Sequence, residues 1–285
     1  MSQPLKFCYF GTPQVARDTL AALVENGFIP ALVVTAPDAP RGRGLMLTPS
    51  PVKEFALEHN LPVITPEKLD AETIDAIHSV ACDYALVVAY GKILPAALIE
   101  SFSSAGGGSS SGGLGIVNVH YSLLPRHRGA TPLEAALLAG DTETGVTIQQ
   151  MVLELDAGDI LAQETTLIGA NETARDLRPR LTELGANLLV KTLPTFERRE
   201  ITPVPQDASQ ATFSRKLKKE DGLLDLNAPA KENWHKYRAY ADTIGTYFFE
   251  GGKRMKITDA EFAGGEFRVL RVIPEGKREM PYAGR

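Results

Sequence analysis

The chain has 285 residues, of which 44% are hydrophobic and 23% are charged, a composition that excludes disorder throughout and a length that allows two domains. The formal net charge is −5. Residues 201–285 hold 15 Lys and Arg against 12 Asp and Glu, while the first 200 hold 15 against 23, which excludes a broadly basic coat for nucleic acid and leaves local basic contacts.

The first half of the chain alternates between strand-like and helix-like segments. Because strands that alternate with helices are typical of βαβ units, a parallel sheet is predicted, with ligands beyond the carboxyl ends of its strands. The Gly11-Thr12-Pro13 turn lacks the spacing of a dinucleotide fingerprint and gives no reason to expect a nucleotide cofactor. The predicted strands are 5–10, 29–35, 63–64 and 84–89, and the predicted helices are 13–26, 51–59 and 71–80.

Two segments further along the chain have the amino-acid composition of linkers. Residues 103–113 are Ser- and Gly-rich, as in a flexible linker, and either a natural insertion or an engineered loop would account for them. A run rich in Pro, Thr, Gln and Ser then predicts a linker over 201–212. The remaining predicted elements are strands at 160–168, 255–258 and 267–273 and helices at 174–193 and 233–240. The predicted division is a catalytic domain at 1–198, a linker at 199–214 and a small β-rich domain at 215–285.

No segment predicts a membrane span, a secretory signal or a metal site. The longest apolar run, 84–99, is interrupted by Gly91, Lys92 and Pro95, and the N-terminus does not match a signal peptide. The two cysteines, Cys8 and Cys82, lie in apolar runs, which favours small buried thiols over a disulfide or metal ligands. We therefore expect a cytoplasmic protein without a bound metal.

Asn118, His120 and Asp156 are the candidate catalytic residues. Asn118 and His120 alternate along a β-branched run, so both side chains leave an extended strand by the same face. An amide donor and an imidazole on one face, with a carboxylate to orient the imidazole, can stabilise an oxyanion and move a proton. Each motif alone is more often structural, a lone strand histidine above all. The combination predicts acyl transfer without a protein nucleophile.

A set of motifs in a fixed order identifies the family that this chain resembles. The motifs cover nearly all of residues 1–200, and their number and order make chance agreement negligible. They resemble the folate-dependent formyltransferases, most closely the members that act on aminoacyl-tRNA. The motifs are Phe10-Gly11-Thr12-Pro13, Gly42-Arg43-Gly44, and the segments 47–53, 88–91, 93–95, 118–125, 140–149 and 155–160.

The resemblance implies an α/β fold, with a Rossmann-like parallel-sheet domain and a barrel-like C-terminal domain that is shorter than usual. It also implies 10-formyltetrahydrofolate as formyl donor and initiator methionyl-tRNA as acceptor, for translation initiation, with no metal. Asn118 and a protonated His120 would donate hydrogen bonds to the oxyanion. Asp156 would hold His120, favour its charged form and help to carry the proton. We expect a monomer.

Two groups of binding residues follow from the resemblance. Ile93 and Leu94 would contact the folate ring in this interpretation, and the alternative is that they pack in the core. The basic residues would contact tRNA, and the alternative is that they form a solvated face. Ser122 is expected to shape its loop rather than act as a nucleophile. The folate group is Tyr90, Ile93, Leu94, Ser122, Leu123, Leu124, Pro125 and Leu155. The tRNA group is Arg41, Arg43 and Lys53 in the 37–53 segment, with Arg215, Lys216 and Lys218.

The motifs leave open which molecule accepts the formyl group. Related enzymes share the Asn-x-His and Asp signature but formylate nucleotide amino sugars, and they usually have a shorter segment in place of 37–53. That segment favours tRNA. A non-catalytic folate-binding module is the second alternative, although Asn118, His120 and Asp156 are all intact.

Overall fold

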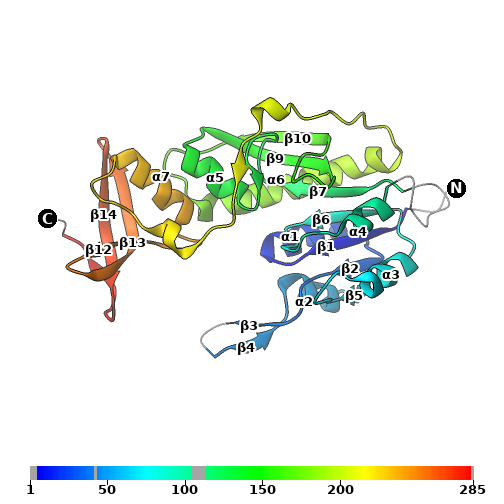
Figure 1. Cartoon of the computed structure of the whole chain (residues 1–285), viewed down its shortest axis with the longest axis horizontal. Coiled ribbons are helices and arrows are strands. Elements are labelled where there is room, and N and C mark those ends of the chain that lie inside the picture. Colours follow the sequence, from blue (N-terminus) through cyan, green and yellow to red (C-terminus); the bar gives the residue numbers. More distant parts are fainter. Residues whose placement is uncertain (1–4, 42–43, 104–112, 284–285) are drawn as a thin grey trace.

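The computed structural model describes residues 5–41, 44–103 and 113–283. Most of the Ser- and Gly-rich segment, together with Arg43 of the predicted tRNA group, lies outside the described residues. Figure 1 shows an elongated molecule with a large α/β unit at one end and a small antiparallel sheet at the other. In the described ranges, no helix is both long and apolar enough to span a membrane.

A seven-stranded sheet forms the centre of the larger unit (Figure 1). Its order is β10-β9-β7-β6-β1-β2-β5, in which the strands from β7 to β5 are parallel and β9 runs opposite to both of its neighbours. The predicted parallel sheet is thus confirmed for five strands, with a mixed edge. The strands are β1 (Phe7–Gly11), β2 (Leu32–Val34), β5 (Val63–Ile64), β6 (Tyr84–Val88), β7 (Ile116–His120), β9 (Glu143–Gln150) and β10 (Ile160–Leu167).

Helices cover both faces of this sheet, and the two faces carry separate hydrophobic clusters. Successive strand residues point to opposite faces, so Leu86 joins one cluster while Ala85 and Val87 join the other. Both cysteines are buried free thiols, as predicted. The first face is covered by α1 (Gln14–Glu25), α2 (Pro51–Glu58), α5 (Pro132–Ala139) and α6 (Ala174–Glu197), and the second by α3 (Ala71–Ser79) and α4 (Ala96–Ser101).

Helix α6 is longer than predicted. The sequence predicts that this helix ends at residue 193, before Pro194, but the helix continues to Glu197. A proline removes one helical hydrogen bond, whereas the buried Leu193 and Phe196 hold the last turn against the core. The sequence prediction also missed α4, α5 and the hairpin of β3 (Ala39–Arg41) and β4 (Met46–Thr48), which are short elements with weak periodicity.

The smaller unit is β-rich, as predicted. Helix α7 (Ala230–Tyr240) packs Trp234 and Tyr237 against an antiparallel sheet of order β12-β13-β14-β15. Among the described residues, β12 and β15 are the two edge strands of this sheet, and Tyr247 of β12 forms one further bridge to Leu223. Its strands are β12 (Thr246–Glu250), β13 (Lys253–Ala263), β14 (Glu266–Pro274) and β15 (Met280–Pro281).

The connection between the two units is attached to the larger unit along its length. Strand β11 (Phe213–Ser214) pairs in parallel with β8 (Arg128–Gly129). The Trp234 indole donates to the Ala170 carbonyl at 3.3 Å, and helix α7 packs on α5. The predicted domain boundaries at 198 and 214 stay predictions.

Candidate active site

Asn118 and His120 leave strand β7 by the same face. Their neighbours Val117 and Val119 are buried in the opposite hydrophobic cluster, because side chains alternate along a strand. His120 is 5% exposed, whereas Asn118 is half-buried, and within the described part of the chain the Asn118 amide has no hydrogen-bond partner. Its two N–H groups are therefore available to a ligand.

Asp156 lies beside His120 on the loop between β9 and β10. One carboxylate oxygen is 3.7 Å from His120 Nδ1 and accepts from the Gly129 N–H at 2.7 Å, while the other accepts from Gln149 Nε2 at 3.0 Å. A Cβ on Gly158 would come within 1.7 Å of the Gln150 carbonyl oxygen, so only glycine allows the loop to turn back here. These contacts hold the carboxylate against the imidazole.

The hydrogen bonds of His120 define its tautomer. Its Nε2 lies 3.0 Å from the carbonyl oxygen of His127, and because a carbonyl only accepts, Nε2 carries the proton. Nδ1 then faces Asp156. In the neutral ring Nδ1 has a free lone pair, which is the arrangement of a general base.

Burial favours the neutral form of the free imidazole. Burial lowers the pKa of His120 from its ordinary value of 6.5, and the Asp156 carboxylate offsets only part of this lowering. This corrects the expectation of a protonated His120, because desolvation of the charged ring outweighs the nearby carboxylate. A proton taken up at Nδ1 would then face Asp156, which stabilises the imidazolium as it forms.

The first prediction concerns the titration of His120. In the Asp156→Asn variant we expect the pKa of His120 to fall below that of the wild type, because the one carboxylate that favours the charged ring is removed. Imidazole NMR signals followed against pH measure both midpoints. An unchanged or higher midpoint in the variant would show that Asp156 does not act on His120 through its charge.

Gln206 supports the Asp156 loop and was missed by the sequence prediction. Its amide donates to the carbonyls of Asp156 at 2.8 Å and Gly158 at 2.7 Å, and its oxygen accepts from Arg128 Nη2 at 2.9 Å. It lies in the predicted linker, where no local pattern distinguishes it. Gln149 could have been found from the sequence, because it alternates with Thr147 along β9 and the two side chains therefore leave the strand by the same face.

The second prediction is that Gln206→Ala destabilises the protein by about 1–3 kcal/mol, since partly buried hydrogen-bonding groups lose their partners. Turnover should fall as well, because the Asp156 loop loses two of its anchors. Urea unfolding and steady-state kinetics measure the two effects. Gln210→Ala is the matched control, because Gln210 is an exposed glutamine of the same segment.

The predicted folate residues do not share one environment. Leu94 is 6% exposed and packs in the core with Tyr90, whereas Ile93 is 95% exposed and Leu155 is 58% exposed. Burial raises the pKa of Tyr90 to about 12, and its hydroxyl has no partner among the described residues. Ile93 and Leu155 are thus the two apolar side chains of this group that are exposed and can contact a ligand.

The predicted loop after β7 is held by internal hydrogen bonds. The fully buried Ser122 donates through Oγ to the Arg126 carbonyl at 2.6 Å, and the Leu124 N–H donates to Thr147 Oγ1 at 3.1 Å. Leu123 and Pro125 are half-buried, and the peptide bond before Pro125 is cis. The Ser122 hydroxyl is therefore engaged in shaping the loop.

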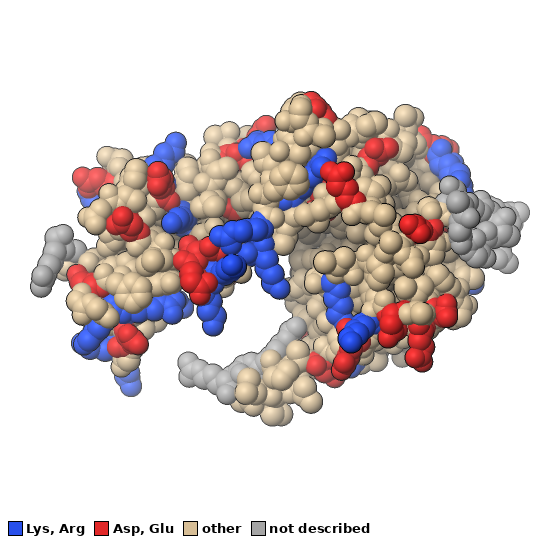
Figure 2. Space-filling view, in the orientation of Figure 1, with Lys and Arg blue, Asp and Glu red and all other residues tan. Residues whose placement is uncertain are grey.

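Lys and Arg side chains gather at the edge of a hollow between the two units (Figure 2). Lys53 pairs with Asp38 at 2.6 Å, and Arg215 makes two hydrogen bonds to Asp221, so both are partly neutralised. Lys216 and Lys218 are exposed. Figure 2 shows Lys and Arg atoms over the segment after β11, on the side of the hollow opposite the β3–β4 hairpin, where the Arg41 backbone lies.

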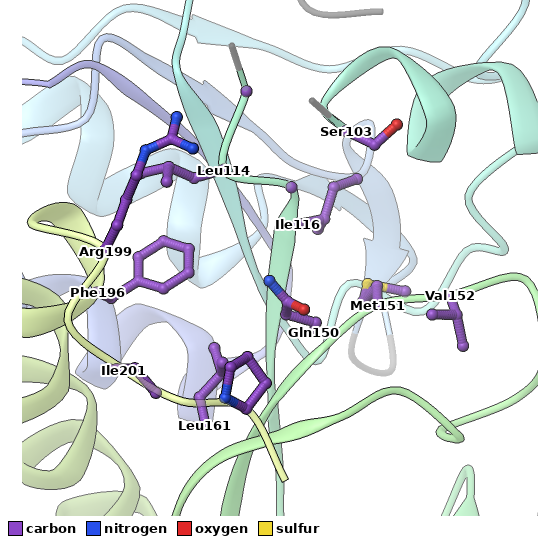
Figure 3. Close-up of a pocket in the computed structure, with 13 residues that line it drawn as sticks. Ser103, Leu114, Ile116, Gln150, Met151, Val152, Leu161, Phe196, Arg199 and Ile201 are labelled. Carbon is purple, nitrogen blue, oxygen red and sulfur yellow. The ribbon is translucent and has the colours of Figure 1, made fainter. Parts of the chain in front are cut away.

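A cavity of about 430 Å³ lies elsewhere, at the start of β7 (Figure 3). Ile116, Met151 and Phe196 are among its lining residues, and Asn118, His120 and Asp156 are not. It therefore does not contain the candidate catalytic groups. In the described ranges, no three His, Cys, Asp or Glu side chains are grouped to hold a metal ion.

Comparisons with known proteins assign the family of this chain. The family model "Formyl transferase" matches residues 5–193, and "Formyl transferase, C-terminal domain" matches residues 216–269. The chain belongs to the formyltransferase family. It is 38% identical to a methionyl-tRNA formyltransferase of Citrifermentans bemidjiense, over 96% of this chain and 83% of the relative.

Two further formyltransferases illustrate the range of the family. A methionyl-tRNA formyltransferase of Halorhodospira halophila is 42% identical over 91% of this chain and 81% of its own length. The N-formyltransferase of Helicobacter canadensis, solved with folinic acid and dTDP-3-aminofucose, superposes with a TM-score of 0.67 at 19% identity, over 91% of this chain and 88% of that one. At that identity the likeness shows the shared fold alone.

Proposed function

We propose that this chain transfers the formyl group of 10-formyltetrahydrofolate to the α-amino group of methionyl-tRNA, and that it does so as a cytoplasmic monomer. The observation that carries the proposal is the placement of His120 Nδ1 3.7 Å from the Asp156 carboxylate, on the same strand face as the Asn118 amide, which has no hydrogen-bond partner among the described residues. The relatives named methionyl-tRNA formyltransferase support this acceptor, because they match the chain over most of its length.

The residues suggest the following sequence of bonds. The acceptor amine attacks the formyl carbon, a new C–N bond forms, and the formyl oxygen becomes an oxyanion that accepts from the Asn118 amide. His120 Nδ1 takes the proton from the attacking nitrogen and gives it to N10 of the folate as the C–N10 bond breaks. Asp156, 3.7 Å away, stabilises the imidazolium between these two transfers. The products are the formylated amine and tetrahydrofolate.

The folate donor is supported by the exposed apolar side chains close to the catalytic groups in the sequence. Ile93 follows β6, the neighbour of the catalytic strand, and Leu155 precedes Asp156. Exposed apolar side chains of this kind suit the faces of a flat ring. Folinic acid in the H. canadensis enzyme is in keeping with this class of donor.

Mass spectrometry of initiator methionyl-tRNA, incubated with the chain and 10-formyltetrahydrofolate, tests the proposal. We expect formylmethionyl-tRNA as the product. A parallel reaction with a dTDP-amino sugar tests the alternative acceptor, because the H. canadensis enzyme was solved with such a ligand. Formylation of the sugar and not of the tRNA would reject the tRNA acceptor. Folate binding without either product would indicate a non-catalytic folate-binding module.

A further inference from the structure

A tight turn that begins at His127 contacts both catalytic side chains. The His127 carbonyl oxygen lies 3.0 Å from His120 Nε2, and two residues later the Gly129 N–H donates to the Asp156 carboxylate at 2.7 Å. The shape of this turn therefore sets where the imidazole and the carboxylate lie relative to each other. His127 has a φ of 59°, in the left-handed region that residues other than glycine rarely adopt. The turn thus needs contacts that hold His127 in this conformation.

His127 makes two such contacts, one through its backbone and one through its side chain. The His127 N–H donates to Thr212 Oγ1 at 2.8 Å. Its Nε2 lies 2.8 Å from an Asp141 carboxylate oxygen, and since a carboxylate only accepts, this nitrogen donates. Asp141 directly follows Gly140, the C-cap of α5, and its other oxygen accepts from Arg126. His127 is 8% exposed, and a hydrogen bond in so buried a place is stronger than in water, so the side chain attaches the turn firmly to the end of α5.

Two acceptors compete for the proton of the neutral His120 ring. The His127 carbonyl, at 3.0 Å, favours the tautomer with the proton on Nε2. The Asp156 carboxylate, at 3.7 Å from Nδ1, favours the tautomer with the proton on Nδ1. Because the carbonyl is closer, the proton lies on Nε2, and the Nδ1 lone pair stays available to an attacking amine. If the carbonyl moved away, the carboxylate would draw the proton to Nδ1, and Nδ1 would no longer be a base.

We propose that His127 is a positioning residue for formyl transfer: its bond to Asp141 holds the turn, and the turn keeps His120 in the tautomer with a free Nδ1. This inference rests on the proposed function, in which Nδ1 takes the proton of the attacking amine. His127 itself does not touch the reacting atoms in this assignment. It acts through its carbonyl oxygen, whose place depends on the anchored side chain.

The test compares His127→Ala with His127→Gln in steady-state formylation of methionyl-tRNA. Alanine removes the donor to Asp141, and we expect kcat to fall about tenfold or more with little change in KM, because fewer molecules keep Nδ1 free. Glutamine carries an N–H donor at a similar distance from the backbone, so His127→Gln should keep kcat within about threefold of the wild type. His78→Ala is the matched control, since His78 is an exposed histidine of α3, and it should leave kcat unchanged.

The nitrogen NMR shifts of the His120 imidazole measure the tautomer in the free protein, and the His120→Gln variant assigns the signals. In the wild type and in His127→Gln we expect the proton on Nε2. In His127→Ala we expect it to move to Nδ1, toward Asp156. A side chain with a purely structural role would lower the unfolding midpoint and leave the tautomer as it is.

The outcomes separate this inference from the proposed function. A His127→Ala variant with the wild-type tautomer would overturn the inference, whatever its rate. No formylation of methionyl-tRNA by the wild type would overturn the proposed function, whereas the tautomer of the free protein would still test the effect of His127 on His120. If circular dichroism shows that His127→Ala does not fold, Asp141→Ala removes the same bond from its half-buried acceptor, and the same move of the proton to Nδ1 is expected.

Discussion

His120→Gln is expected to lower kcat for formyl transfer by about 10²–10⁴-fold, the usual contribution of a positioned general base. Glutamine can still donate a hydrogen bond to the His127 carbonyl, which His120 contacts at 3.0 Å, so the loop after β7 keeps its anchor. An amide cannot take up the proton of the attacking amine at neutral pH. The loss should therefore be in kcat, with little change in the KM for methionyl-tRNA.

Single-turnover kinetics with saturating folate measures this loss directly. His78→Gln makes the same substitution at an exposed histidine of α3 and should leave kcat unchanged. Circular dichroism and the unfolding midpoint show whether the His120 variant keeps its fold. A variant that folds and keeps more than about a tenth of the wild-type kcat would mean that His120 is not the base.

The catalytic strand could be predicted from sequence because alternation along a strand is a local property. The period of two places Asn118 and His120 on one face whatever the rest of the fold does. The parallel sheet was predictable for the same reason, from strands and helices that alternate along the chain. Its mixed edge was not, because β9 follows a loop whose direction no local pattern defines.

Other features of the site depend on residues far apart in the chain. The lowered pKa of His120 results from burial, whereas a motif that contains a carboxylate predicts a raised pKa. Gln206 reaches Asp156 across 50 residues of sequence. Arg215 reads as a free cation in the sequence, yet its guanidinium is bound to Asp221. Contacts of this kind follow from tertiary packing, so sequence periodicity does not contain them.

Asn118→Ala is expected to lower kcat by about 10²–10³-fold, or about 2.7–4 kcal/mol, as is typical for the loss of one oxyanion donor. The fold should be retained, since the half-buried Asn118 amide has no hydrogen-bond partner within the described residues. Asn118→Asp should be at least as damaging, because a carboxylate of the same shape repels the oxyanion. Single-turnover rates for the two variants measure both effects.

The titration of His120 distinguishes the role of Asn118 from an indirect effect on the base. If Asn118 acts on the oxyanion alone, Asn118→Ala should leave the NMR midpoint of His120 where it is, since the pKa of His120 is lowered by burial and is otherwise affected by Asp156 and His127, not by Asn118. A shifted midpoint together with a slower rate would assign the loss to the imidazole instead. A normal midpoint with a rate near that of the wild type would show that Asn118 is not a donor to the oxyanion. The combination of a normal midpoint and a slow rate is therefore the result that only an oxyanion donor produces.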